Sequence, residues 1–244
     1  MDGVNKRHSI CFFTDVFISG GVEKVLIDTI KLLHNDYDIT LYVATDNVNS
    51  KLKAEVEKYA RVEVGNVNIT KKIFILLALP CTGKHILEKI IKTKYDCMFV
   101  CKPSIMTVVF TNISKKYIYW NHTDKDVMYA NNNLSFFKKI NKVRLTYIYK
   151  KYNLILSVVP EIAQSIGKAF NLSNSEELIN PINKQLIIQK SQSGLSDFNK
   201  SNKLNMCSVG RLSKEKRFDM LINAASKLDN TKYQLYIIGE GEER

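Results

Sequence analysis

The sequence has no hydrophobic run long enough to cross a membrane. Near its start the apolar residues 10–13 are followed at once by Thr14 and Asp15, which leaves too short a core for a signal peptide. The longest other apolar stretch, residues 73–79, ends at Pro80 and falls far below the roughly 18 residues that a spanning helix needs. We therefore predict a cytoplasmic protein that is neither secreted nor transmembrane.

The cysteines show no pairing or metal-binding pattern. There are five, an odd number, and no Cys-x-x-Cys pair or cysteine–histidine cluster completes a zinc site. Cys97 and Cys101 lie in an expected strand, where four residues extend over about 13 Å, so the two thiols cannot share one metal ion. Reduced thiols in a cytosolic protein are the better interpretation, and we expect no metal and no cofactor.

Acidic residues are scarce relative to basic ones. The sequence has 36 lysines and arginines against 24 aspartates and glutamates, which gives a formal net charge of +12. Such a surplus favours a polyanionic partner: nucleic acid, anionic lipid headgroups or a diphosphate-bearing substrate. A lysine-rich solvated surface explains the charge equally well, so composition leaves both interpretations open.

Short apolar strands alternate with helical patterns along the chain. Strands are expected at residues 8–15, 38–45, 61–67, 95–102, 115–124 and 153–159. Helices are expected at residues 22–33, 71–80, 84–94, 135–152 and 160–170. This alternation predicts an α/β fold with a mostly parallel sheet covered by helices on both faces.

The composition changes after the first long alternation. Residues 189–203 contain few apolar side chains, which is typical of a linker or surface loop. A strand at 204–210, a helix at 218–228 and a strand at 233–238 then begin a new α/β pattern. We expect a first domain over residues 1–183, a connector over 184–202, and an incomplete start of a second domain over 203–244.

Two adjacent glycines, Gly20 and Gly21, separate the first expected strand from the first expected helix. Glycine lets backbone N–H groups approach a ligand, and the positive end of a helix suits a phosphate or a network of sugar hydroxyls. A tight strand-to-helix turn would require glycine anyway. A ligand role and a purely structural role are both open at this point.

Basic residues follow a later strand. Arg211 comes directly after the strand that ends at Gly210, at the edge of the sheet where ligands of open α/β folds bind. Lys216 lies near the start of the next helix, and two cations beside a helix N-terminus can hold a diphosphate without a metal. Gly239 and Gly241 follow the last strand and are a weaker signal for a nucleotide-side loop.

A polar segment after the strand at 115–124 contains the candidate catalytic residue. His122 lies between Asn121 and Asp124, at the carboxyl end of that strand. A lone histidine is more often structural than catalytic. An imidazole in such a loop can nevertheless donate a hydrogen bond to a hydroxyl or to a developing charge, so a functional role is as well supported as a structural one.

Several of these segments together resemble a known family. "GRLSKEKRFDMLINAASKL" and "YQLYIIGEGEER" closely resemble the donor-binding start of the C-terminal domain in retaining glycosyltransferases of family 4, which have the GT-B architecture of two Rossmann-like domains. "GGVEKVLIDTIKLL" is similar to the glycine loop and first helix of that family, and "LINPIN" to its interdomain stretch. The segments follow in the family's order and cover nearly the whole chain.

The resemblance implies roles for the candidate residues. Arg211 and Lys216 would hold the diphosphate of a nucleotide-sugar donor, Gly20 and Gly21 would line the cleft, and His122 would face the transferred sugar. Family members continue with an E-x-x-x-x-x-x-x-E motif that this sequence does not show. We therefore expect an incomplete form: a truncated gene product, a fragment, or a chain completed by a partner.

The function expected from the resemblance is sugar transfer, with retention, from a nucleoside diphosphate sugar to a glycan or lipid-linked acceptor in cell-surface polysaccharide synthesis. The alternative is a non-catalytic remnant that binds acceptor or membrane. Nucleic acid is not an expected partner, because no reading module accompanies the charge. The basic helix at 135–152 is expected either to touch anionic membrane at the inner face of the plasma membrane or to pack its apolar side on its own sheet.

Overall fold

The computed structural model describes residues 7–18, 20–67, 80–130, 134–193 and 202–244 of the chain. It divides into two compact units, Met1–Asn183 and Lys184–Arg244. The first contains a seven-stranded sheet and the second a separate two-stranded sheet. The helix expected over residues 71–80 lies, except for Pro80, outside the described residues.

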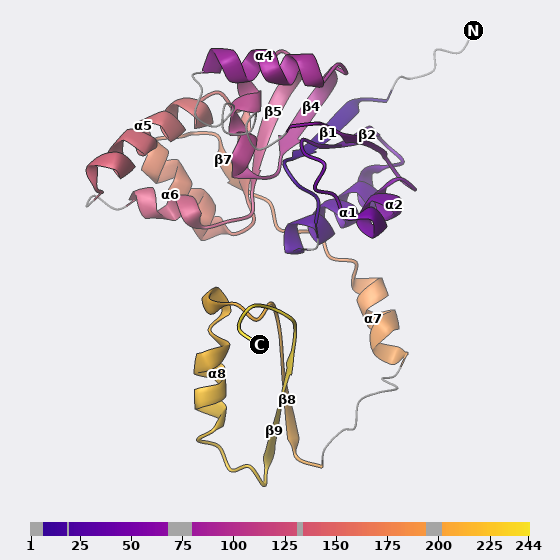
Figure 1. The fold of residues 1–244 in the computed structure, drawn as a ribbon, viewed down its shortest axis with the longest axis vertical. Helices are drawn as coiled ribbons and strands as arrows, with labels where there is room; N and C mark the ends of the chain where they lie inside the picture. Colours follow the sequence, from indigo (N-terminus) through magenta and orange to yellow (C-terminus); the bar gives the residue numbers. More distant parts are fainter. Residues whose placement is uncertain (1–6, 19, 68–79, 131–133, 194–201) are drawn as a thin grey trace. The chain divides into compact units, whose positions relative to one another are not determined.

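The strands of the first unit form one parallel sheet in the order β3-β2-β1-β4-β5-β6-β7 (Figure 1). Their bounds are β1 (Ser9–Thr14), β2 (Asp38–Val43), β3 (Arg61–Val64), β4 (Tyr95–Val100), β5 (Ser114–Asn121), β6 (Leu154–Ser157) and β7 (Ser175–Glu177). The predicted α/β fold with a parallel sheet is confirmed.

Helices cover both faces of this sheet. On one face lie α1 (Gly21–Leu33) and α2 (Ser50–Val56), which contribute Leu26, Ile30 and Val56 to one core cluster. On the other lie α4 (Pro80–Ile90), α5 (Phe136–Tyr149) and α6 (Pro160–Phe170), whose apolar residues join the second cluster. Two 3₁₀ helices, η1 (Pro103–Phe110) and η2 (Lys125–Ala130), follow β4 and β5.

Strand β1 shows how the sequence builds both clusters at once. Cys11 and Phe13 pack in the cluster beneath α4 and α5, whereas Ile10 and Phe12 pack in the cluster beneath α1. Successive side chains of a strand point to opposite faces, so a strand buried on both sides must be apolar at every position. This is why the central strands are continuous apolar runs rather than alternating ones.

Helix α2 was not expected from periodicity, because it is short. It begins after Asn49, whose side-chain oxygen accepts hydrogen bonds from the backbone N–H groups of Lys51 and Leu52 at 3.0 and 3.2 Å. Asparagine is among the preferred N-cap residues because it satisfies donors that the first turn leaves free. The local signal for this helix is therefore its cap rather than an apolar stripe.

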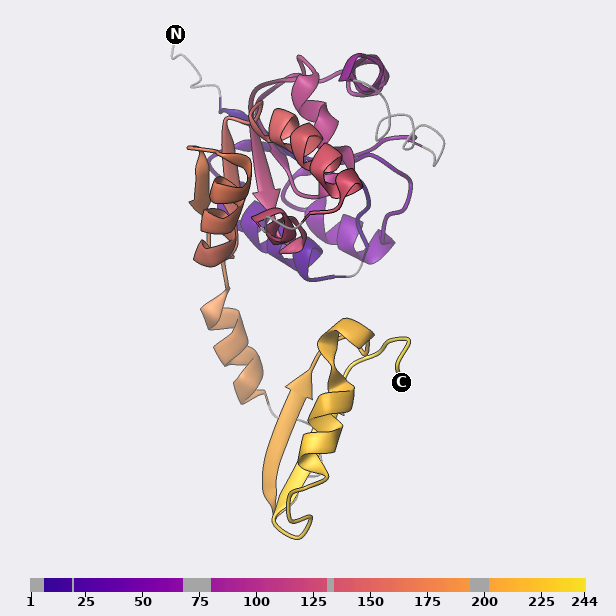
Figure 2. The same cartoon turned by 90° about the vertical axis from the view of Figure 1, so that its left-hand side faces the viewer.

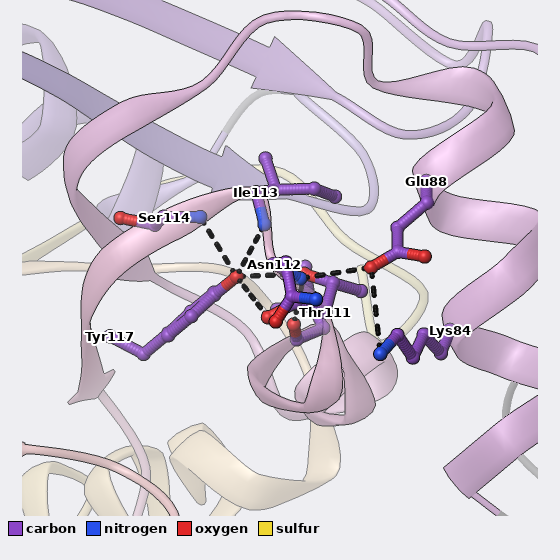
Figure 3. A network of polar contacts seen from close by, with 8 residues as sticks. Lys84, Glu88, Thr111, Asn112, Ile113, Ser114 and Tyr117 are labelled. Atoms are coloured by element: carbon purple, nitrogen blue, oxygen red, sulfur yellow. Dashed lines mark hydrogen bonds and ion pairs between the residues drawn. The ribbon is translucent and has the colours of Figure 1, made fainter.

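A buried hydroxyl fixes the start of β5, at the amino edge of the sheet (Figure 3). The oxygen of Tyr117 accepts from the backbone N–H groups of Ile113 and Ser114 at 3.1 and 3.0 Å and donates to the carbonyl of Thr111 at 2.9 Å. Beside it, the carboxylate of Glu88 on α4 accepts from the backbone of Asn112 at 2.9 Å. The Tyr117 bonds hold the η1–β5 turn together, and the Glu88 bond ties that turn to α4.

The second unit contains α7 (Lys184–Gln192), β8 (Leu204–Val209), η3 (Lys214–Lys216), α8 (Phe218–Ala225) and β9 (Tyr233–Ile238). Strands β8 and β9 are parallel, and α8 runs alongside them, as Figure 2 shows. Helix α7 occupies residues expected to form a connector, including 189–192 of the predicted loop. Its lysines, glutamines and leucine are good helix formers, which explains a helix with no buried residue.

Of the helices that the structure describes, none is both long and apolar enough to cross a bilayer.

Candidate functional site

The strand order of the first unit reverses at β1. The chain passes from β1 to β2 on one side, and β4 pairs with β1 on the other. In open α/β sheets such a switch point leaves a crevice at the carboxyl ends of the strands, where ligands bind. The segments that leave β1, β4 and β5 at this edge carry Gly20 and Gly21, Lys102, and His122 respectively.

Gly20 and Gly21 differ in what surrounds them. A Cβ atom on Gly20 would lie 2.6 Å from a carboxylate oxygen of Glu23, whereas a Cβ on Gly21 would meet no atom within 4 Å. Gly20 has an extended backbone, with φ of 179°, so its glycine identity reflects close approach rather than a left-handed conformation. A side chain at Gly20 would displace the Glu23 carboxylate, while the space beside Gly21 is open.

Glu23 also forms a buried ion pair near the carboxyl edge of the sheet. Glu23 is 3% exposed, and its carboxylate lies 2.7 Å from the ammonium of Lys102. Lys102 Nζ also donates to the carbonyl oxygen of Val16 at 3.2 Å. A buried carboxylate requires such a partner, so the pair fixes the loop after β1 against the end of β4.

His122 packs on Trp120 at the end of β5. Their ring centroids are 4.7 Å apart with an interplanar angle of 44°. Burial, together with the positive charge of Lys102, lowers the pKa of His122 to about 4, so the imidazole is neutral at physiological pH. Its Nε2 atom is buried and has no hydrogen-bond partner within the described part of the chain.

The loop after His122 is held by Asn121, which is 1% exposed. Its side-chain amide donates to the carbonyl of Thr123 at 2.8 Å, and its side-chain oxygen accepts from the Thr123 backbone N–H at 3.1 Å. This local turn directs the chain away from the strand while His122 stays against Trp120. Asp124 is exposed. The arrangement supplies a rigid, neutral hydrogen-bonding group at the carboxyl edge.

The second unit places its candidate cations on one loop. Arg211 and Lys216 lie between β8 and α8, and both side chains are exposed. Neither forms an ion pair with any residue that the structure describes, whereas the neighbouring Arg217 is occupied by Asp219, with contacts of 3.1 and 3.0 Å. The loop therefore keeps Arg211 and Lys216 available for an anion, and Arg217 serves the start of α8.

Gly239 and Gly241 have a steric reason to be glycines. A Cβ atom on Gly239 would lie 1.8 Å from the carbonyl oxygen of Gly210, and one on Gly241 would lie 2.0 Å from that of Leu212. The two loops are also hydrogen-bonded, from the N–H of Gly210 to Ile238 at 3.0 Å and from that of Leu212 to Glu240 at 2.9 Å. The glycines thus join the loop after β9 to the loop that carries Arg211, and their nucleotide role stays a prediction.

The ion pair of Glu23 and Lys102 was not foreseen from the sequence. The two residues are 79 positions apart, and each alone is an ordinary charged residue after a strand. The available local signal was Glu23 itself, a carboxylate on the buried side of an amphipathic helix, with Leu26, Ile27 and Ile30 as its neighbours on that side. A charge at such a position requires a partner, although only the tertiary structure identifies it.

Within the described residues, no group of three or more histidine, cysteine, aspartate or glutamate side chains is placed to hold a metal ion. Cys11 and Cys101 are buried free thiols, and burial raises the pKa of both. They belong to the core of the first unit.

Structures of similar fold have been determined in complex with UDP or with UDP-sugars. The Anabaena protein HepE in complex with UDP-glucose has a TM-score of 0.61 at 15% identity, and UGT89C1 of Arabidopsis thaliana in complex with UDP-L-rhamnose has 0.54 at 13%. An α-glucosyltransferase in complex with UDP and DNA has 0.51 at 12%. The fold is that of GT-B glycosyltransferases.

The similarity extends over most of this chain but only part of each neighbour. The matches cover 96% of this chain and 61% of HepE, 96% and 70% for UGT89C1, and 91% and 54% for the α-glucosyltransferase. No family model and no curated protein sequence matches the chain. The GT-B fold is therefore established by structure, while the identities of 12–15% say nothing about individual residues.

Proposed function

We propose that this chain belongs to an enzyme that transfers a sugar from a nucleoside diphosphate donor. The observation that carries the proposal is the GT-B fold, which it has in common with proteins that bind UDP-glucose and UDP-L-rhamnose. The candidate residues lie where such a fold binds ligands, on loops at the carboxyl ends of parallel strands. The finer proposals below concern the donor, the sugar and the acceptor.

The donor diphosphate is assigned to Arg211 and Lys216. Negative charge develops on this group as it departs from the sugar, and fixed cations aimed at the leaving oxygens are the largest expected contribution to catalysis. An arginine supplies a planar fork and a lysine a point charge, a combination suited to adjacent phosphates. In this proposal the two cations take the place of a divalent metal, and the reaction needs no cofactor.

The transferred sugar is assigned to His122. Because its pKa is lowered to about 4, the side chain acts as a neutral imidazole, which donates one hydrogen bond and accepts another. Its unpartnered Nε2 suits a sugar hydroxyl. Binding of a phosphate would instead favour a positively charged histidine. Glu23 and Lys102 are assigned as positioning residues, because their ion pair holds Lys102 where its charge helps to lower the pKa of His122.

The family 4 resemblance adds three proposals of its own. Transfer would proceed with retention of the anomeric configuration, the acceptor would be a glycan or a lipid-linked glycan, and the product would enter cell-surface polysaccharide. These proposals rest on the quoted motifs, because fold similarity by itself does not select among sugar acceptors.

Calorimetric titration of the whole chain with UDP, and with uridine as a reference, tests the diphosphate assignment. We expect UDP to bind more tightly than uridine, and Arg211→Gln/Lys216→Gln to weaken UDP binding by at least about tenfold, because hydrogen bonds to charged groups contribute about 1.5–3 kcal/mol each. The matched control is Lys214→Gln, an exposed lysine of the same loop. If Lys214→Gln weakened UDP binding equally, the binding would reflect general attraction between charges rather than a specific site.

A non-catalytic acceptor-binding or membrane-binding domain is the second candidate, and the exposed face of α5 favours it. Release of UDP from a panel of UDP-sugars distinguishes the two. Release that is lost in His122→Ala but kept in His8→Ala, an exposed histidine at the amino edge, supports the enzyme. Binding of UDP without release by any donor and acceptor would support the second candidate.

A further inference from the structure

Helix α5 has two apolar faces. Leu145, Ile148 and Tyr149 are buried in the core of the first unit, with exposures of 8%, 3% and 0%. On the other side Phe136, Ile140, Val143 and Tyr147 remain exposed, at 71%, 53%, 72% and 53%. Their spacing of four, three and four residues places them in one stripe along the helix. The expectation that the helix packs its apolar side on its own sheet is confirmed by the buried face, whereas contact of the outward face with membrane stays a prediction.

The outward stripe is strengthened at its N-terminal end and flanked by cations. Phe137, next to Phe136, is 82% exposed, the largest value among the exposed large hydrophobic residues of the described chain. The basic residues of the segment are Lys138, Lys139, Lys142, Arg144, Lys150 and Lys151, and residues 135–152 contain no aspartate or glutamate. By helical spacing Lys139 and Lys150 lie on one flank of the stripe and Arg144 and Lys151 on the other, with Lys151 over the Tyr147 ring, whereas Lys142 turns to the Tyr129 carbonyl on η2. Such an outward apolar stripe between cations matches a helix that lies at a lipid–water interface.

The composition of this face favours lipid over protein as its partner. Protein–protein interfaces are enriched in arginine and depleted in lysine, whereas this segment has five lysines and one arginine. Juxtamembrane lysines gain about 1 kcal/mol each from the negative potential of anionic lipids. The exposed phenylalanine rings can insert at the boundary between headgroups and acyl chains. A basic surface that only faced water would have no use for such rings.

The position of α5 relates this face to the candidate site. In a parallel β–α–β crossover the helix runs antiparallel to the strands, so the N-terminal turn with Phe136 and Phe137 lies toward the carboxyl edge, where β5 ends at Asn121 before His122. The helix also holds η2, the segment that follows His122. Asn141 donates to the Tyr129 hydroxyl at 2.5 Å, and Lys142 donates to the Tyr129 carbonyl at 2.9 Å.

A further contact comes from the buried side of the same helix. The hydroxyl of Tyr149 donates to the carboxylate of Asp126 on η2. The face that remains outside and the face that supports the loop after His122 therefore belong to one rigid helix. Anything that docks on the outer stripe is fixed relative to that loop.

We propose that the outer stripe of α5, formed by Phe136, Phe137, Ile140, Val143 and Tyr147 with its flanking cations, docks on an anionic lipid surface. Docking brings the carboxyl edge of the first unit, with His122, to the headgroup region. The proposal deepens the proposed function, on which its biological meaning rests, because it places the acceptor at a membrane and so favours a lipid-linked acceptor over a free glycan. Vesicle binding requires no sugar donor, so its failure and the failure of sugar transfer are distinguishable.

Sedimentation of the whole chain with lipid vesicles tests the surface. We expect binding to phosphatidylcholine vesicles that contain about one quarter phosphatidylglycerol and little binding to pure phosphatidylcholine. Lys139→Gln/Lys150→Gln should weaken binding roughly 30-fold, the effect of losing two exposed lysines beside the stripe at about 1 kcal/mol each. The matched control is Lys51→Gln/Lys58→Gln, which removes the same charge from exposed lysines in and after α2 and should leave binding unchanged.

A second variant separates the apolar stripe from the charge. Phe136→Ser/Phe137→Ser alters exposed side chains and should keep the melting temperature while it abolishes most vesicle binding. Equal binding to neutral and anionic vesicles, or equal loss in the Lys51/Lys58 control, would overturn the proposal. So would a dimer in sedimentation velocity that the phenylalanine variant converts to monomer, because the stripe would then be a contact between copies of this chain.

Hydrogen exchange tests the connection to the site. Vesicles should protect the backbone amides of α5 and also those of η2 in the wild-type chain. Tyr129→Phe/Tyr149→Phe removes the two hydroxyl contacts while it keeps both rings in the core, and should confine the protection to α5. Protection that never extends beyond α5 in the wild type would contradict the fixed relation between the stripe and the His122 loop.

Discussion

The two units of this chain are built from the same local pattern but differ in the burial of their apolar side chains. In the first unit a parallel strand such as β1 has neighbours on both sides and helices on both faces, and Phe12 and Phe13 are each 1% exposed. In the described part of the second unit β8 pairs with β9 alone, and Leu204 and Val209 are 63% and 73% exposed. All buried hydrophobic residues of the described chain lie in the first unit.

The difference shows that secondary structure and a core have separate requirements. Strand, loop and helix form in both units because their patterns are local. A core requires neighbours that remove apolar side chains from water on both faces of the sheet, and that removal supplies most of the free energy of folding. We therefore expect the first unit to carry the stability of the chain.

The candidate sites follow the same division. Burial in the first unit lowers the pKa of His122 and requires Glu23 to pair with Lys102. In the second unit Arg211 and Lys216 remain exposed, so an anion bound there competes with water and salt. Burial therefore alters the candidate residues of the first unit, whereas Arg211 and Lys216 of the second unit lie in water.

The largest expected effect comes from separating the units. A polypeptide of residues 1–183 should unfold in one cooperative transition close to that of the whole chain, because it keeps every buried apolar residue of the described structure. A polypeptide of residues 184–244 should show no cooperative transition. Thermal unfolding followed by circular dichroism measures both, and a sharp transition in residues 184–244 would break the comparison.

A matched pair of leucine substitutions gives the next effect. Leu41 is fully buried in β2, and Leu41→Ala should lower the free energy of unfolding by about 2–5 kcal/mol. Leu235 in β9 is partly exposed, and Leu235→Ala should leave the main transition within about 0.5 kcal/mol of the wild type. Urea denaturation of the whole chain provides the numbers, and similar costs at the two positions would show that the units share one cooperative core.

A smaller effect should appear in the pH dependence of stability. Between about pH 4 and 6.5 unfolding allows His122 to bind a proton that the folded chain excludes, so stability falls as the pH drops through this window. We expect a loss of about 3 kcal/mol across it in the wild type relative to His122→Gln. The fluorescence of Trp120, the sole tryptophan, provides a local readout.

The smallest effects should come from two glycines. Gly20→Ala meets only the end of the flexible Glu23 side chain, so we expect a cost of about 1 kcal/mol or less as the carboxylate shifts. Gly239→Ala meets backbone, the carbonyl of Gly210, and should open the junction between the loops after β8 and β9. Amide exchange at Gly210 reports that opening. Unchanged protection there would show that the junction is not held by close approach.

The sequence alone determined the order and kind of most elements, because the spacing of apolar residues along the chain distinguishes strands from amphipathic helices. It predicted the parallel sheet, the basic helix α5 and the polar loop of His122. Only the tertiary structure decided the strand order, the pairing of Glu23 with Lys102 and the burial that lowers the pKa of His122. It also decided which face of α5 remains outside. Each of these depends on contacts between distant segments, whose geometry no local pattern contains.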